Sequence, residues 1–557
     1  IPDWVVPPVD SPAVAERNLA HQDWWWTESS GWISAMSLIV LGQFLGRVSY
    51  FSLGFLLFRL TSDRERLPFP LAPIAAEGAT ALAESTEKKG TDREHWRWET
   101  FSVGATLGFF FGLLYLFLPV VTGLFFAKPI TLFPIPFVDL TSNAESVLPA
   151  SLISISFDAL MLLTGMILPF PLVVGIFVAV ILTSVIGNPI LQSYGWFEHW
   201  SPGNGLLVNQ MILSFDFWMS VTCGLALTVA VVGLATVFGK KEKPLPLAPS
   251  PQCGEGERFS PPLHEVERGP GGEVFKARGD FPIWLCVAAY LFTTTAFCWL
   301  VHHLVPGFPL WILIVFGFLW TPLQSYISAR LIGITGSGLS VPYLKESAFI
   351  LSGYRGLDIW FAPMQTGDFG SAAQRFRELE LTRTRFTSVL KAEALILPVS
   401  LITSFLFWWG FWKMNQIPSD SFPFISRTWP VQARQAYLIL TANSGEHSLL
   451  LDALKPDLIV GGAIAGFLLY GGAWLVGLPA TVFYGLVGGT AMPLHMGLLL
   501  MGGALLGRYV FKKKFGEERW TRMVPVVTAG FACGMGLAGM LAVGAAILSY
   551  CTKSLPF

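Results

Sequence analysis

Charged residues are scarce in this chain of 557 residues: only 13% are Asp, Glu, Lys or Arg, whereas 53% are hydrophobic. A soluble domain normally has about a quarter of its residues charged, so the deficit argues against a soluble protein and indicates a polytopic membrane protein. The formal net charge is −1. It leaves no basic surplus to neutralise phosphates, which argues against nucleic acid as a partner.

Paired cysteines and catalytic motifs are also missing. The six cysteines are scattered, and none belongs to a C-x-x-C pair, so neither a disulfide framework nor a zinc site is indicated. The sequence has no G-x-S-x-G, no H-E-x-x-H and no Walker-type glycine loop. We therefore expect no enzyme, no metal site and no cofactor.

Long apolar runs are what the chain does contain. A run that crosses ~30 Å of hydrocarbon needs ~20 mostly apolar residues. We predict an all-α polytopic membrane protein with about eleven or more transmembrane helices, some of them broken or re-entrant. The ranges that meet the requirement are 32–60, 101–127, 149–169, 171–192, 211–238, 281–304, 308–331, 389–412, 457–477 and 522–549, and Pro479 and Pro493 divide a further apolar region at 478–510.

Lys and Arg in the connections predict the orientation of the spans, because they favour the cytoplasmic side. The connections near 128–148 and 193–210 are assigned to the outside. When the predicted spans after residue 412 are counted, the last basic cluster falls on the cytoplasmic side only if one segment is re-entrant or broken. The basic clusters assigned to the cytoplasm are 59–97, 240–278, 345–385 and 508–522.

The chain divides into four predicted parts. Residues 1–31 are interpreted as an interfacial lead-in, and because the chain begins with Ile1 rather than Met we expect further residues before it. Residues 32–239 and 281–557 form two transmembrane halves. Residues 240–280, rich in Pro, Gly and charge, are predicted to be a disordered cytoplasmic linker. Short Pro/aromatic similarities between the halves raise internal duplication as one hypothesis.

Few ionisable side chains lie inside the predicted spans, where a charge costs ~2.5–3.5 kcal/mol at a helix centre. Arg47 is centrally placed and is the candidate for binding an anionic group; the alternative is an ion pair between two helices. Asp158, in "SFDALM", or Glu77 is the candidate for binding a proton or an amine, and the alternative for Asp158 is a capping carboxylate. For Asp216, in "SFDFWM", we favour the interpretation as a capping carboxylate.

Gly and Pro recur at membrane depth, as in "VIGNPILQ", "VPGFPLWI" and "GLPATVFYGLVGGTAMPLHMG". Unwound backbone is tolerated there only where protein or a watery cavity satisfies its polar groups. Carriers expose helix ends to substrate at such breaks. The number and clustering of the breaks favour a broken-helix carrier over helices that are merely kinked.

Three blocks of sequence resemble the oligopeptide transporter (OPT) superfamily, which also contains the yellow-stripe-like metal-chelate carriers. They are "RLPFPLAPIAAEGATALAE", "LKESAFILSGYRGLDIWFAP" and "KFGEERWTRMVPVVTAGFACGMGLAGM", and the bacterial branch is the most similar. The resemblance implies an internally duplicated carrier that moves peptides or peptide-like chelates with protons. The chain has "GNPI" where fungal and plant members have Asn-Pro-Gly, so no substrate residue is transferred by position.

The stretch "SGYRGLDIWFAP", followed closely by "GDFG", has two interpretations. Tyr354, Arg355 and Asp358 form a cytoplasmic gate latch that opens when Asp358 or Asp368 is protonated, with Arg355 and Asp358 paired on one helix face. In the other interpretation the stretch is an interfacial anchor with a structural turn.

The function predicted from these features is secondary active transport of oligopeptides across the plasma (inner) membrane of a bacterium, coupled to protons. The alternatives are a carrier of metal chelates, such as siderophores, or of other organic anions on the same scaffold, and a non-transporting membrane subunit. The expected partners are small peptides or peptide-like chelates and the lipid bilayer. The sequence makes no prediction of the oligomeric state.

Overall fold

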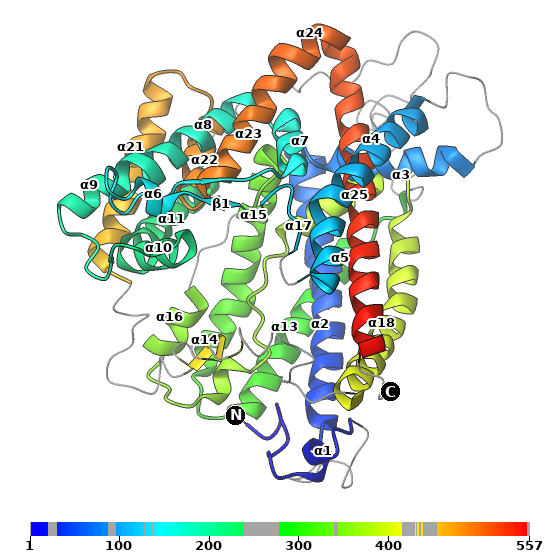
Figure 1. Cartoon of the computed structure of the whole chain (residues 1–557). Coiled ribbons are helices and arrows are strands. Elements are labelled where there is room, and N and C mark those ends of the chain that lie inside the picture. Colours follow the sequence, from blue (N-terminus) through cyan, green and yellow to red (C-terminus); the bar gives the residue numbers. More distant parts are fainter. Residues whose placement is uncertain are drawn as a thin grey trace.

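The computed structural model describes residues 2–19, 31–86, 96–126, 129–134, 137–238, 278–338, 344–414 and 454–553, with isolated residues between 429 and 440. Helices dominate these ranges, where the strands are two of two residues each. Ten helices of this described part are long and apolar enough to cross a membrane. The prediction of an all-α polytopic membrane protein is therefore confirmed (Figure 1).

The helices fall on either side of the predicted linker, which lies outside the described residues except for 278–280. Turns labelled η are π-helical, apart from η7, which is a 3-10 turn. Before the linker come α1 (Pro12–Ala15), α2 (Ile33–Phe58), η1 (Arg59–Arg64), α3 (Ala72–Thr86), α4 (Trp96–Gly112), η2 (Leu113–Phe117), α5 (Leu118–Phe125), β1 (Val138–Asp139), α6 (Thr141–Ala144), β2 (Ser154–Ile155), α7 (Ala159–Ile167), α8 (Phe170–Val180), η3 (Ile181–Gly187), α9 (Asn188–Ser193), α10 (Leu206–Leu213), η4 (Ser214–Trp218) and α11 (Met219–Phe238). After it come α13 (Ile283–Leu304), α14 (Leu310–Ile314), η6 (Val315–Trp320), α15 (Thr321–Thr335), α16 (Leu344–Leu351), η7 (Asp358–Trp360), α17 (Gly370–Leu381), α18 (Phe386–Met414), α21 (Pro456–Leu475), α22 (Ala480–Thr490), α23 (Leu494–Leu506), η8 (Gly507–Phe511), α24 (Lys512–Phe515) and α25 (Glu517–Lys553).

Every predicted span except 149–169 coincides with a spanning helix, and that one prediction is wrong. In its place β2 pairs antiparallel with β1, and the helix α7 begins only at Ala159. The Leu152 N–H donates to the Ser184 carbonyl at 3.0 Å, in the π-helical turn η3. A short apolar run is equally compatible with a buried extended segment, so composition alone could not separate the two.

α22 and α23 form a re-entrant hairpin that turns halfway along a neighbouring span. Before the turn Gly489 packs against Ile176, and after it Gly497 packs against Val180; both partners lie in the middle of the span Phe170–Ser193. The 11 residues of α22 rise by about 16 Å, which is half of the ~30 Å hydrocarbon thickness. This hairpin supplies the re-entrant segment that the charge distribution requires after residue 412.

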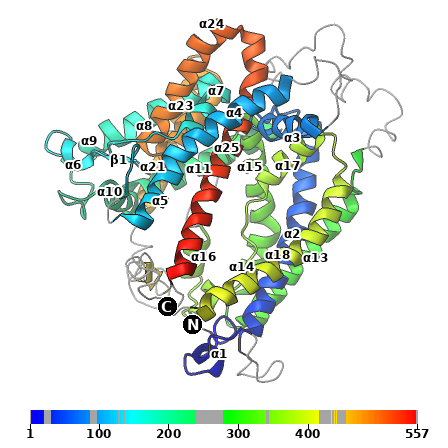
Figure 2. The ribbon, with the colours of Figure 1, turned by 45° about the vertical axis from the view of Figure 1, so that its right-hand side comes forward.

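Helices of the first half pair with helices of the second half. The pairs α4–α25, α8–α22, α7–α23 and α11–α21 approach closely at glycines, where a Cβ atom would collide with the backbone of the partner helix. Gly108 faces the Phe531 carbonyl in the first pair, and Gly224 faces the Ile459 carbonyl in the last. Small residues allow membrane helices to approach in this way. Figures 1 and 2 show α8, α11, α21 and α22 gathered on one side of the molecule.

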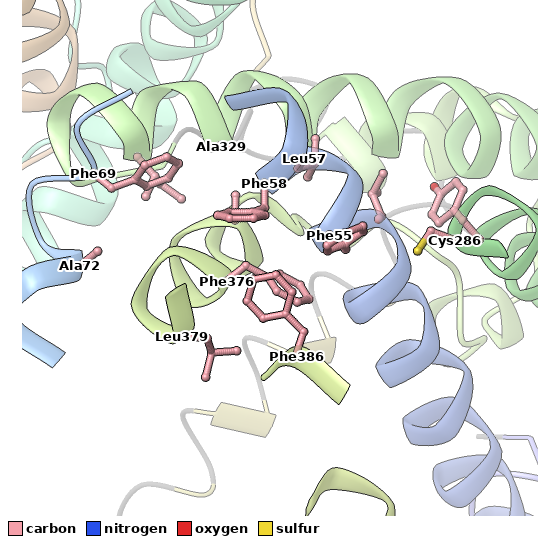
Figure 3. Close-up of a cluster of buried hydrophobic side chains, with 14 residues drawn as sticks. Phe55, Leu57, Phe58, Phe69, Ala72, Cys286, Ala329, Phe376, Leu379 and Phe386 are labelled. Carbon is pink, nitrogen blue, oxygen red and sulfur yellow. The ribbon is translucent and has the colours of Figure 1, made fainter. Parts of the chain in front are cut away.

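An aromatic core joins α2, α15, α17 and the first residue of α18 (Figure 3). Phe55, Phe58, Phe376 and Phe386 are almost completely buried and pack edge-to-face or tilted, with ring centroids 5.1–6.4 Å apart. Arg278 covers the rings of Phe58 and Phe386 at 5.2 and 5.5 Å. This core fixes the positions of the four helices at one end of the bundle.

Arg278 also holds an ion-pair network at this end of the bundle, which we call the basic end. It bonds Asp63, Asp280 and Glu380 at 2.7–2.9 Å. Burial alone would lower the pKa of Arg278, but hydrogen bonds to Asp280 and Asp63 outweigh it and raise the pKa above its ordinary value. The last three residues of the predicted linker are thus part of the packed structure.

The assignment of all of 345–385 to the cytoplasmic side is wrong, because this segment reaches both ends of α13. Glu380 contacts Arg278, which precedes α13. The Tyr354 ring instead lies against Gly307 and Phe308, which follow α13, at what we call the opposite end. The 22 residues of α13 separate these points by about 33 Å. Residues 361–369 therefore cross the bundle as a non-helical chain.

We predict that Gly534→Ala destabilises the protein, because its Cβ would collide with the Ala105 carbonyl in the α4–α25 contact. Overpacking of this kind costs about 1–3 kcal/mol. Gly536→Ala, on the same helix, is the control, because its added Cβ would have no other atom within 4 Å. Thermal unfolding of the purified protein in nanodiscs should show a lower midpoint for the first variant alone; equal midpoints would contradict the proposed contact.

Candidate functional site

Asp158 stands at the N-terminus of α7 as its N-cap. Its Oδ1 accepts hydrogen bonds from the backbone N–H groups of Leu160 at 2.9 Å and Met161 at 3.3 Å. The capping alternative stated for this residue is therefore present in the structure. Its Oδ2 makes no hydrogen bond to the described residues, so the carboxylate keeps one oxygen available for a ligand.

His495 stands in the first turn of α23, next to the tip of the re-entrant hairpin. Its Nδ1 lies 2.8 Å from Ser154 Oγ of β2, and Phe137 stacks on its ring at 5.0 Å. The residue is 6% exposed, and its Nε2 makes no hydrogen bond within the described part of the chain. Pro493 precedes α23 and provides no side-chain cap, so the positive end of this helix is left open.

α7 and α23 lie side by side and run in the same direction, since Leu162 and Met166 of α7 contact Gly503 and Gly507 of α23 (Figure 1). β2 connects their N-termini, because Ser154 bonds His495 and Asp158 follows shortly after in sequence. We call this place the broken-helix junction.

Tyr115 of η2 completes the polar side of the junction. Its hydroxyl interacts with the Ser156 side chain, two residues before Asp158. A chain of rings, Tyr115, Phe111, Phe133 and Phe157, continues from it with centroids 5.1–6.0 Å apart. The junction thus presents an acid, an imidazole and an open helix N-terminus next to an aromatic wall. This arrangement suits a small molecule that has both an amine and a carboxylate.

Arg47 forms an ion pair with Glu393 of α18, with Nη1 and Oε1 3.5 Å apart. The two side chains are 46% and 29% exposed, so the pair is neither tight nor buried. A Cβ atom added at the neighbouring Gly42 or Gly46 would have no other atom within 4 Å, so this face of α2 is open. A competing carboxylate therefore has access to Arg47.

Glu77 does not lie at the broken-helix junction. Arg97 binds it at 2.8 Å and binds Glu84 at 2.9 Å, which ties α3 to α4. The carboxylate of Glu77 is thus engaged in a helix-to-helix ion pair. No contact within the described residues joins Arg47, Glu77 and Asp158 to one another.

The crossing chain at 361–369 is held by hydroxyl groups of α15. Thr321 Oγ1 donates to the Gln365 carbonyl at 3.1 Å, and the Phe369 N–H donates to Ser325 Oγ at 3.0 Å. One turn further along, Ser328 Oγ donates to Asp368 Oδ2 at 2.5 Å. These three hydroxyls lie on one face of α15 and are fully buried. They replace the hydrogen bonds that a helix would make internally.

Asp368 is the one predicted gating residue that lies on the crossing chain. Its carboxylate accepts hydrogen bonds from the Ser328 hydroxyl and from the Gly370 N–H. The residue nevertheless has an exposed surface.

Tyr354 and Asp358 form a clamp at the opposite end. The Tyr354 hydroxyl lies 2.8 and 2.9 Å from the two Asp358 oxygens, and burial followed by this hydrogen bond raises the pKa of Tyr354 to about 12. Arg355 and Asp358 do not share a helix, because helical structure begins only at Asp358. The predicted Arg355–Asp358 pair is absent from the described contacts, and Tyr354 takes its place.

His495 is a functional candidate that was not found from the sequence, although the "AMPLHMG" stretch, with Pro just before the helix, signals a helix start. Asp216 accepts hydrogen bonds from the His199 backbone N–H at 3.1 Å and from its Nδ1 at 2.8 Å, so it is a buried loop anchor.

The spans, the re-entrant hairpin and the broken-helix junction together define a multi-pass membrane protein. The family model described as OPT oligopeptide transporter protein matches residues 10–366, which is more than half of the chain. The chain belongs to this family of transporters. No curated protein matches it. The matched residues include Asp158 and α7, whereas His495 and α23 lie beyond them.

Proposed function

We propose that the chain is a proton-coupled carrier of small peptides and that the broken-helix junction binds the peptide. The observation that supports this most is the placement of Asp158 and His495 at the N-termini of two adjacent helices, one of which begins at a mid-span turn. Carriers commonly bind substrate where discontinuous helices present their ends. Membership of an oligopeptide transporter family supports the same class of substrate.

A zwitterionic peptide matches the two signs of charge at the junction. Asp158 Oδ2 would accept its amine, while the open N-terminus of α23 and His495 Nε2 would face its carboxylate. Backbone amides of the peptide would bond Ser156 and Tyr115, and its side chains would lie against Phe133 and Phe157. Arg47, whose pair with Glu393 is exposed, would bind the carboxylate at another point of the path.

Proton coupling would use Asp368. Protonation would weaken the ionic component of its bonds to Ser328 and the Gly370 N–H, which fasten the crossing chain to α15 and α17. The crossing chain would then loosen at the basic end, while the Tyr354–Asp358 clamp holds the opposite end. The excess of Lys and Arg at the basic end supports a cytoplasmic location for that end, in a bacterial plasma membrane.

Uptake of a mixed peptide pool into proteoliposomes, with and without an inward proton gradient, tests the proposal. Mass spectrometry identifies the peptides that accumulate. We expect gradient-dependent accumulation that falls about tenfold or more in Asp158→Asn, because Asn retains the N-cap but not the charge that binds the amine. Arg47→Ala should raise the KM with a smaller effect on the maximal rate.

Asp457→Asn, an exposed acid in the first turn of α21, is the matched control and should transport as wild type does. Normal uptake by Asp158→Asn would exclude the junction as the amine site. Accumulation of metal chelates or other organic anions in place of peptides would identify the alternative substrate class on the same scaffold. Uptake that does not depend on the proton gradient would exclude protons as the coupling ion.

A further inference from the structure

The turn between the last two spans carries a concentrated group of basic residues. Residues 508–522 contain six basic and two acidic side chains, a net charge of +4 in a chain whose net charge is −1. Neither the broken-helix junction nor the crossing chain accounts for this concentration. We call the basic residues the α24 cluster; they are Arg508, Lys512, Lys513, Lys514, Arg519 and Arg522.

Stacked aromatic rings hold this turn in one shape. The ring of Trp520 in α25 lies parallel to those of Phe511 and Phe515, with centroids 4.5 and 5.8 Å apart. Lys512 bonds Glu517 across the same turn at 2.8 Å. The backbone that carries the other basic side chains is therefore ordered by the protein itself, which lowers the entropy lost when a ligand binds them.

The depth of the α24 cluster follows from the helix that leads to it. The helix Leu494–Phe515 begins at the mid-span turn, and Arg508 follows about 21 Å further along at 1.5 Å per residue. Headgroups occupy the zone ~15–22 Å from the bilayer midplane. The Arg508 guanidinium accordingly covers Phe170, the first residue of a span, at 4.7 Å. Figures 1 and 2 show α24 projecting beyond the neighbouring helices at this end.

An apolar surface leads up to these charges. Leu505, Leu506 and Val510 are exposed, although they lie in or next to the hydrocarbon zone. Lys513 and Lys514 are exposed one turn further out. The exposed side chains thus change from apolar to basic along the helix axis. A molecule with a hydrocarbon tail and an anionic head matches this order.

We propose that the α24 cluster binds an anionic phospholipid, with Arg508, Lys513 and Lys514 contacting its headgroup and the apolar surface contacting its acyl chains. Groups of Lys and Arg next to a span attract anionic lipids. A zwitterionic lipid is disfavoured, because its ammonium group would meet the net positive charge of the turn. A soluble anion would leave the apolar surface unused. The bound lipid holds the charged end of the helix whose other end carries His495.

Native mass spectrometry of the purified full-length protein, released from micelles that contain equal amounts of phosphatidylglycerol and phosphatidylcholine, tests the site. Wild type should retain phosphatidylglycerol in preference to phosphatidylcholine. Lys513→Gln combined with Lys514→Gln should lose one retained phosphatidylglycerol, because each basic residue near the surface contributes about fivefold to the affinity. Both positions are exposed, so the variant keeps the packing of the turn.

Arg385→Gln combined with Lys391→Gln is the matched control. It removes the same charge from two exposed positions on either side of Phe386, which belongs to the aromatic core. This control should retain the lipid, as should Lys513→Arg combined with Lys514→Arg, which keeps the charge. An equal loss in the control and in the Gln variant would show general attraction to the protein and overturn the proposal.

Two results with wild type would also overturn the proposal. Equal retention of the two lipids is expected if the α24 cluster serves only to orient the spans. Displacement of phosphatidylglycerol by inorganic phosphate at the same concentration would identify a soluble anion as the ligand. None of these measurements involves peptide uptake, so failure of the proposed function leaves them unaffected.

Discussion

Backbone N–H and C=O groups inside a bilayer must be satisfied by the protein itself, because lipid offers them no partners. This constraint governs the two non-helical segments of the structure. The chain before α7 donates a hydrogen bond from its Leu152 N–H to the Ser184 carbonyl, which η3 releases from the regular helical pattern. The crossing chain is held by hydroxyls of Thr321 and Ser325. Both segments lie where a neighbouring helix supplies replacement bonds.

The same constraint explains where polar chemistry appears. A helix that starts partway through the bundle must cap its first N–H groups, and Asp158 does so for α7. α23 has no such cap, so its positive end stays open. A strictly continuous bundle would offer neither feature. The candidate binding site of this protein therefore lies at a break between helices, and the apolar spans around it position that break.

The sequence predicted the helical class and nearly every span, because a continuous apolar run of about twenty residues has few other solutions. It also required a re-entrant or broken segment late in the chain, and the α22–α23 hairpin is a re-entrant one. It could not predict the extended chain before Asp158, since apolar strands and helices share a composition. The bond between Ser154 and His495 was also beyond it, because that contact depends on how distant helices pack. The sequence could not predict Tyr354 as the partner of Asp358 either, because that contact depends on a local turn of the chain.

The glycine-lined pairs have a consequence for how the chain is made. Each of α4, α8 and α11 has its closest partner more than two hundred residues later, in α25, α22 and α21. During synthesis the early spans enter the membrane with their glycine surfaces unfilled, and they wait there until the last part of the chain is inserted. Assembly is therefore a late event that needs the whole chain. A nascent protein interrupted before α25 would leave α4 without its partner and open to quality-control factors that recognise unpaired helices.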